Sequence, residues 1–193
     1  MSWNGWRAVL LLIVFASLTL NSCTRERSVE AAGDRAQPSI AETEQAFTQT
    51  ATQAHLAEID MARIAMEKSN NKDVSDYANM IRSDHGSALE TLTDLMIDKH
   101  VPQVRTLAPQ TQQDITRMTT LNGPEFDREF VNMMVSDHQK AISLFRDQQG
   151  ISQNPDISKY VEGVLPTLEL HLEKALRLQS RLFSSQAPRP RYK

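Results

Sequence analysis

Four side chains that are able to bind a metal ion lie at core-facing positions of this sequence: Glu58, His85, His138 and His171. Each lies in a separate segment in which apolar residues recur every three or four positions, the spacing of a buried helix face. Burying a carboxylate and imidazoles in an apolar core is costly unless something pairs them. Three imidazoles and a carboxylate suit zinc, iron, copper, nickel or manganese. We therefore predict that these four side chains bind one transition-metal ion, and the sequence does not choose among these five metals.

The positions of the four residues along their helices agree with a shared site. Glu58 and His85 lie twelve and thirteen residues from the ends of their helices at a predicted turn near 70–71. His138 and His171 lie twelve and sixteen residues from the corresponding ends at a second turn. Because the two helices of a hairpin run antiparallel, we expect all four residues near the middle of one helical bundle.

Three further polar residues are candidates for the surroundings of the site. Asp84 and Asp137 each precede a histidine in one of two Ser-Asp-His triplets, about 100° round the helix from it. Each could reach a neighbouring helix, as an extra ligand or as the acceptor of an imidazole N–H, or could face solvent. His55 lies one turn before Glu58, beside the apolar stripe, and is an alternative ligand.

A second interpretation of the polar layer needs no metal. Glu58 could pair with a protonated histidine, and the layer would then fix helix register in a structural or protein-interaction protein. A dinuclear iron centre is not expected, because none of the three histidines has a glutamate three residues before it. No nucleophile arrangement and no phosphate-binding glycine loop identifies an enzyme. If the protein is an enzyme, the ligand set suggests a metal-dependent oxidoreductase.

The periodicity predicts an all-α protein with four long helices in a ferritin-like bundle and a short extra helix between the second and third. The long helices are expected over about 39–69, 72–99, 124–150 and 155–184, and the short helix over about 109–122. Ser39 is expected to cap the first helix. The long connection over 101–123 fits two hairpins joined by a crossover, and an up-down-up-down order is the alternative.

Residues 1–22 have the layout of a lipoprotein signal peptide. Arg7 precedes an apolar run that is shorter than the ~20 residues a membrane span requires. The run ends in Leu20-Asn21-Ser22-Cys23, which has the form of a lipobox, and an uncleaved signal anchor is the alternative. We expect lipid on Cys23 to anchor the protein to the membrane at the periplasmic face of the envelope. Thr24 favours the outer over the inner membrane.

The remaining segments and the charge balance narrow the function further. Residues 23–38, which include the lipidated Cys23, are expected to form a flexible tether, residues 39–184 the bundle and residues 185–193 a disordered tail. Cys23 is the only cysteine, so no disulfide is expected. The chain has 21 Lys+Arg and 24 Asp+Glu, and removing residues 1–22 removes one basic residue, which leaves 20 minus 24, or −4. This mild acidity gives no reason to expect nucleic-acid binding, and no protein partner is indicated.

Several short motifs occur in order between Phe47 and Leu182. They are Ala57-Glu58, Lys68-Ser69-Asn70, Asp84-His85, Gly123 with Phe126-Asp127, Asp137-His138, and Leu165-Pro166-Thr167-Leu168 with His171-Leu172. In this combination the chain resembles the domain-of-unknown-function 4142 family of bacterial envelope proteins. The resemblance implies a ferritin-like helical bundle that is exported from the cytoplasm, and it implies no particular reaction.

Overall fold

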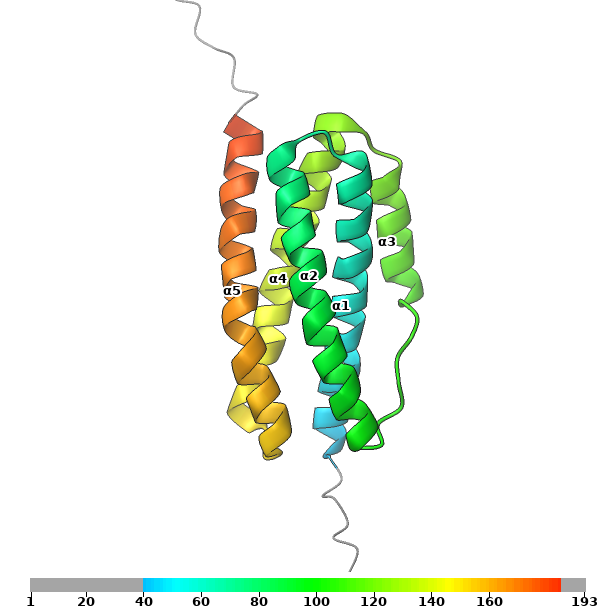
Figure 1. Ribbon diagram of the computed structural model, residues 1–193, viewed down its shortest axis with the longest axis vertical. Helices are drawn as coiled ribbons and strands as arrows, with labels where there is room; N and C mark the ends of the chain where they lie inside the picture. The colour runs from blue at the N-terminus through cyan, green and yellow to red at the C-terminus, as the bar shows by residue number, and fades with distance from the viewer. Residues whose placement is uncertain (1–39, 185–193) are drawn as a thin grey trace, which may run out of the picture. The chain divides into compact units, whose positions relative to one another are not determined.

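A computed structural model of the protein describes residues 40–184, which fold into helices (Figure 1). The predicted signal peptide (1–22), the lipidated Cys23 with its tether (23–38) and the tail (185–193) lie outside the described residues. The helices are α1 (Glu42–Lys68), α2 (Lys72–Asp98), α3 (Pro109–Thr119), α4 (Gly123–Ile151) and α5 (Pro155–Ser184). Residues 40–184 contain no strand, so the prediction of an all-α protein is confirmed for this part of the chain.

The first helix begins later than the sequence predicts. Instead of a Ser39 cap, α1 has Ala41 as its N-cap and begins at Glu42. The reason is Glu44, whose Oε2 accepts the Ala41 N–H at 3.1 Å and so supplies the acceptor half of a capping box.

The other carboxylate oxygen of Glu44 fixes one end of the bundle. Glu44 Oε1 accepts hydrogen bonds from Ser152 Oγ at 2.8 Å and from the N–H groups of the next two residues at 3.1 and 3.0 Å. These donors form the turn between α4 and α5. At the same end, Lys99 directly after α2 pairs with Asp156 in the first turn of α5, at 2.7 Å. The start of α1, the end of α2 and the α4–α5 turn are therefore neighbours.

Contacts at the opposite end settle the direction of each long helix. Lys68 at the end of α1 donates to the carbonyl of Thr119 at the end of α3, at 2.7 Å. Asp73 at the start of α2 pairs with Arg181 near the end of α5, at 3.3 Å. Helices α2 and α4 therefore run parallel, and the connection between them returns along the bundle, as Figure 1 shows. One long crossover is the connection used in ferritin-like folds, and it excludes an up-down-up-down order for the described helices.

The crossover is held against the bundle by polar and apolar contacts. Gln53 of α1 donates to the carbonyl of Thr106 at 2.6 Å and accepts the N–H of Ala108 at 2.8 Å. Ile115 and Met118 of α3 are both buried. Helix α3 thus packs beside α1 and α4.

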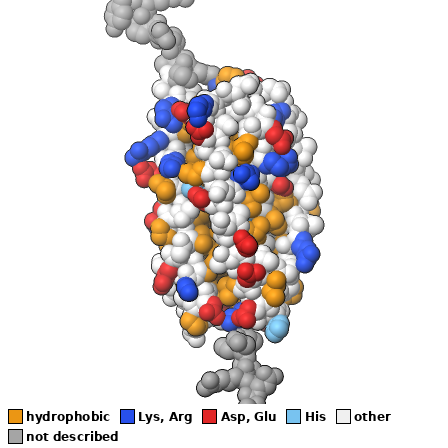
Figure 2. Space-filling view, in the orientation of Figure 1, with side chains coloured by type: hydrophobic (Ala, Val, Ile, Leu, Met, Phe, Trp, Pro, Cys, Tyr) orange, Lys and Arg blue, Asp and Glu red, His pale blue; other side chains and the backbone are white. Residues whose placement is uncertain are grey.

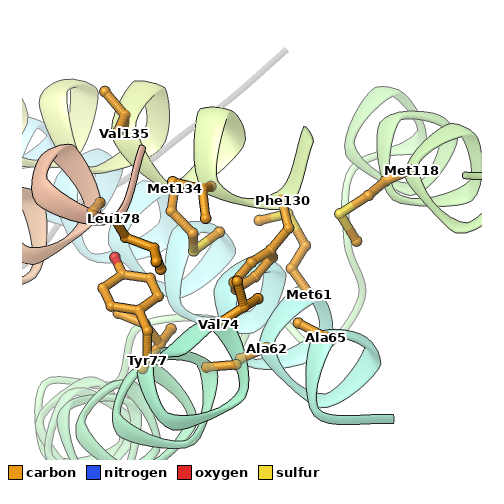
Figure 3. Packing of buried hydrophobic residues seen from close by; sticks show 14 of the residues in the cluster. Met61, Ala62, Ala65, Val74, Tyr77, Met118, Phe130, Met134, Val135 and Leu178 are labelled. Atoms are coloured by element: carbon orange, nitrogen blue, oxygen red, sulfur yellow. The ribbon is translucent and has the colours of Figure 1, made fainter. Parts of the chain in front are cut away.

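A polar layer divides the apolar core into two clusters. The first cluster includes Met61, Ala65, Val74, Tyr77, Met118, Phe130, Met134 and Leu178, which Figure 3 shows together. The second cluster includes Phe47, Leu92, Phe145, Val161 and Leu168. In each long helix, one apolar segment belongs to the first cluster and another to the second, and buried Glu or His residues lie between them.

The surface of the bundle carries charges of both signs. Figure 2 shows basic and acidic side chains interspersed with hydrophobic ones on the face that it displays. No helix among residues 40–184 is both long enough and apolar enough to cross a membrane.

We expect Glu44→Ala to lower the free energy of unfolding by about 1–3 kcal/mol, because the buried N–H of Asn154 in the α4–α5 turn loses its acceptor. Glu42→Ala is the matched control, since Glu42 is exposed two residues earlier, and its effect should stay within about 0.5 kcal/mol. Urea unfolding of both variants measures the difference. Equal effects of the two substitutions would contradict the role assigned to Glu44.

Candidate metal centre

Each of the four long helices contributes one predicted ligand to the layer between the two apolar clusters. Glu58 comes from α1, His85 from α2, His138 from α4 and His171 from α5. All four are buried, with exposed fractions of 0, 2, 0 and 0%. The structure therefore brings together four side chains that are separated by up to 113 residues (171 minus 58) in the chain.

The four side chains turn nitrogen and oxygen atoms toward one small volume. One ring nitrogen each of His85, His138 and His171 lies within 4.8 Å of the others. His85 Nε2 lies 3.3 Å from His171 Nδ1. Glu58 Oε2 lies 3.1 Å from His85 Nε2 and 3.4 Å from His138 Nε2. Spacings of this size allow a single ion to contact the three rings, and Glu58 lies beside two of them.

Some of these inward atoms are buried without a hydrogen-bond partner. Among residues 40–184, both oxygens of Glu58 and Nε2 of His138 have none. The nitrogen and oxygen atoms of Glu58 and the two imidazoles are therefore close, but their angles are not those of hydrogen bonds. Each such unpaired group costs about 1–3 kcal/mol, and a carboxylate costs more. Unpaired acceptors that converge on one point fit a cation, so the residues present suit a metal ion.

The outward nitrogens of the three histidines do have partners. His138 Nδ1 donates to the carbonyl of Met134 at 2.8 Å. His171 Nε2 lies 2.9 Å from Asp84 Oδ2, and His85 Nδ1 lies 3.0 Å from His55 Nδ1. Because a carbonyl and a carboxylate only accept, the proton lies on the outward nitrogen of His138 and of His171, whereas either ring can donate in the contact between His55 and His85. The inward nitrogens of His138 and His171 are then left as lone pairs, the form in which histidine binds a metal, and His85 Nε2 lies within hydrogen-bond distance of His171 Nδ1.

His55 lies behind the layer. It is buried, and its Nε2 lies 2.7 Å from the hydroxyl of Tyr160, so Tyr160, His55 and His85 form one chain of contacts. The sequence places His55 beside the apolar stripe, yet the structure buries it. The buried face of α1 is wider than its stripe of apolar residues and also includes Thr52. Tyr160 is absent from the predicted site. The sequence feature that could have identified Tyr160 as a core residue is its position between the apolar residues Ile157 and Val161, which are both buried.

The two aspartates have different surroundings. Asp84 is 41% exposed at its side chain and contacts His171 on the neighbouring helix. Asp137 is 30% exposed and pairs with Lys140 on its own helix at 3.0 Å. The aspartates thus lie on different sides of the layer, one beside a histidine and the other beside a lysine.

Burial keeps the imidazoles neutral. It lowers the pKa of His55 and of His138 to about 4, and that of His85 well below its usual value. The pKa of His171 is also lowered by burial, against an opposing effect of Asp84. Burial raises the pKa of Glu58 well above its usual value, and the charge of Asp137 adds to this. At neutral pH the histidines are therefore in their metal-binding form.

The fold and site together define an all-helical bundle with a buried layer of histidines and one glutamate. The chain belongs to the domain-of-unknown-function family DUF4142, whose model matches residues 29–178. This confirms the family resemblance predicted from the sequence. No curated protein matches the chain.

Solved structures show the same fold at low sequence identity. A DUF305 fragment from Deinococcus radiodurans is 17% identical, with a TM-score of 0.68, covering 75% of this chain and 99% of the fragment. A DUF305 protein from Streptomyces coelicolor, provisionally assigned as secreted, is 11% identical, with a TM-score of 0.65 and coverages of 73% and 92%. The Cu(II)-bound form of CopM is 19% identical, with a TM-score of 0.62 and coverages of 72% and 96%. At these identities the likeness shows the fold.

The lowered histidine pKa values predict that the metal-free protein loses stability on acidification. His55 and His138 bind protons near pH 6.5 when unfolded but only near pH 4 when folded. Between these values the unfolded state holds more protons, so the free energy of unfolding falls as the pH falls. Glu58 acts in the opposite direction, because its raised pKa favours the folded state below that pKa. Four histidines with lowered pKa values thus reduce the free energy of unfolding at acidic pH, and one glutamate increases it, so we expect a net loss.

Thermal unfolding in the presence of a chelator, from about pH 7 to about pH 4.5, measures this loss as a falling Tm. His55→Gln removes one buried titrating group and should make the fall shallower. The control is His100→Gln, at an exposed position outside the layer, which should leave the slope unchanged. A Tm that is independent of pH in this range would contradict the assignment of neutral buried histidines.

Proposed function

We propose that this protein binds one transition-metal ion in the core of a ferritin-like bundle and serves in metal handling at the bacterial cell envelope. His85, His138 and His171 are the nitrogen ligands, and Glu58 is the oxygen ligand. Copper is the first candidate among the metals that this ligand set suits. A bound copper ion would supply a one-electron couple.

The convergence of imidazole nitrogens on a buried glutamate that has no hydrogen-bond partner is the observation that carries the proposal. Inward nitrogens of three imidazoles and the carboxyl group of Glu58 lie together, and both Glu58 oxygens and His138 Nε2 have no hydrogen-bond partner in the described residues. In a metal-free protein the raised pKa of Glu58 supplies a single proton to this layer. A proton between Glu58 Oε2 and His138 Nε2, which lie 3.4 Å apart, leaves the second oxygen of Glu58 unpaired. A metal ion serves as the partner of every inward atom at once.

The ligand types favour copper over the other candidates. Imidazole suits zinc, copper, iron and nickel, and Cu(II) binds most tightly of the divalent first-row ions to a given site. Structures of CopM, which shares the fold, contain Cu(II), Cu(I) or silver. Only one carboxylate reaches the inward volume in the described residues, so the site suits one ion rather than a bridged pair.

The envelope location rests on the beginning of the chain. Residues 1–22 have the signal-peptide pattern, and lipid on Cys23 would anchor the bundle at the periplasmic face, with the outer membrane favoured over the inner. The likeness to a DUF305 protein provisionally assigned as secreted supports export.

A metal-free architectural role is the second candidate function. It is favoured by the outward contacts, since each of the three histidines already has one partner from a neighbouring residue. In that case the layer would fix the register of the helices, and the bundle surface would bind an envelope partner. Replacing His85 and His138 together by leucine would then be tolerated or stabilising.

Metal content separates the two functions. We expect the full chain, isolated from the envelope in detergent without chelator, to contain about one equivalent of metal by elemental mass spectrometry. A His85→Ala, His138→Ala double variant should contain none, and the exposed control His100→Ala should retain it. Wild-type protein that contains no metal and takes up none of copper, zinc, iron, nickel or manganese would contradict the proposal.

Glu58→Gln tests the layer itself. Its amide supplies two N–H donors beside His138 Nε2, which has no hydrogen-bond partner in the described residues, so the metal-free variant should gain about 1–3 kcal/mol in free energy of unfolding. The same change removes an anionic ligand, so the rise in Tm on adding Cu(II) should shrink. Glu67→Gln is the control on the same helix, where the side chain is 63% exposed. If Glu58 instead pairs with a protonated histidine, Glu58→Gln lowers the stability.

A further inference from the structure

Glu58 links the buried layer to an opening at the surface. It lines a groove of about 290 Å³ between α1 and α4, which we call the α1–α4 groove. Ala54 and Ala57 of α1, Asp137 and Lys140 of α4, and Thr111 of α3 also line it. Glu58 itself is fully buried, and neither of its oxygens has a hydrogen-bond partner in the described residues. An unpaired buried carboxylate therefore lies at the inner end of this groove.

Asp137 lies where this groove meets a second one. The second groove, of about 390 Å³, is also lined by Thr111, Asp137 and Lys140, and it includes the acidic residues Asp114 and Glu129. Asp137 is 30% exposed and so reaches solvent. Its charge acts on Glu58, since it contributes to the raised pKa of that carboxyl. A half-exposed carboxylate and a buried one thus follow each other from the surface to the metal layer.

Lys140 holds the outer position in the present arrangement. Its Nζ lies 3.0 Å from Asp137 Oδ1, and both side chains come from the same helix face of α4. A pair with this exposure is weak, because water screens it and the long side chain loses entropy. An incoming cation can therefore replace the ammonium group at Asp137 at little cost.

We propose that the metal ion reaches the buried layer through the α1–α4 groove, with Asp137 as the outer carboxylate that receives it and Glu58 as the inner one. This inference rests on the proposed function. Asp137 binds the cation from solvent in exchange for Lys140, and the ion then passes to Glu58 and the three inward nitrogens. Asp137 is a transfer residue and not a ligand of the final site.

The groove on the opposite side is larger but has the wrong chemistry at its inner end. It lies between α2 and α5, has a volume of about 790 Å³, and is lined by Asp84 and Tyr160. Asp84 contacts the outward nitrogen of His171, and Tyr160 contacts His55 behind His85. A cation arriving from that side meets the outward N–H of His171, whereas a cation arriving at Glu58 meets carboxyl oxygens that have no hydrogen-bond partner in the described residues.

Stopped-flow mixing with Cu(II) alone tests the route, with quenching of tyrosine fluorescence as the readout of uptake. Asp137→Asn should lower the association rate constant about tenfold and leave Kd unchanged, because a transfer residue slows entry and exit equally. Lys140→Ala should raise the rate constant several-fold, because the competing ammonium is gone. Ala54→Leu narrows the groove without changing charge and should also slow uptake.

Matched controls lie in the opposite groove. Asp94→Asn and Lys159→Ala make the same charge changes between α2 and α5 and should leave the rate constant unchanged.

Unaltered uptake in Asp137→Asn and Lys140→Ala, with copper bound, overturns the route and leaves the proposed function standing. Slower uptake in Asp94→Asn alone assigns entry to the other groove and also overturns it. A weaker Kd in Asp137→Asn with an unchanged association rate makes Asp137 a ligand, against the inference. Wild-type protein that binds no metal removes the proposed function itself.

Discussion

The burial of one carboxylate among three neutral imidazoles sets the constraint that the rest of this bundle meets. Glu58 and the three histidines come from four different helices, so their approach depends on the packing of every long helix at once. The apolar clusters on either side keep water out and hold the imidazoles neutral. The partners of the outward nitrogens then direct the remaining lone pairs inward. Stability is given up in this layer, because both oxygens of Glu58 and Nε2 of His138 are buried without a hydrogen-bond partner in the described residues.

The topology decides which residues surround this layer. With α2 and α4 parallel, α2 packs against α5, and α1 packs against α4. This arrangement brings Asp84 to His171 and leaves Asp137 facing the side of Glu58. In an up-down-up-down bundle α2 would neighbour α4 instead, and Asp84 would meet a different histidine. The long crossover with α3 is therefore part of what defines the site.

The sequence predicts which residues are buried, because helical periodicity alone decides this. It does not predict which side chains of different helices meet, because the packing between helices decides that. The three-and-four spacing placed Glu58 and the three histidines on buried faces, and the turns near 70 and 152 placed them at one level. The same spacing could not rank Asp84 above Asp137, because their local sequences are alike and only the neighbouring helix differs. It gave no reason to join Tyr160 to His55, which lie 105 residues apart. The start of α1 was misplaced because Glu44 supplies the cap from three residues inside the helix.

The division of the core into two apolar clusters has a consequence for how the bundle opens. Leu172 packs against both clusters, and otherwise the halves meet across polar side chains. Each half contains segments of all four long helices and its own set of turns, so each is a candidate cooperative unit in native-state hydrogen exchange. An ion bound between the two halves would couple their opening, because opening either half would expose the ligands of the ion. Loading and release would then switch the domain between one cooperative unit and two.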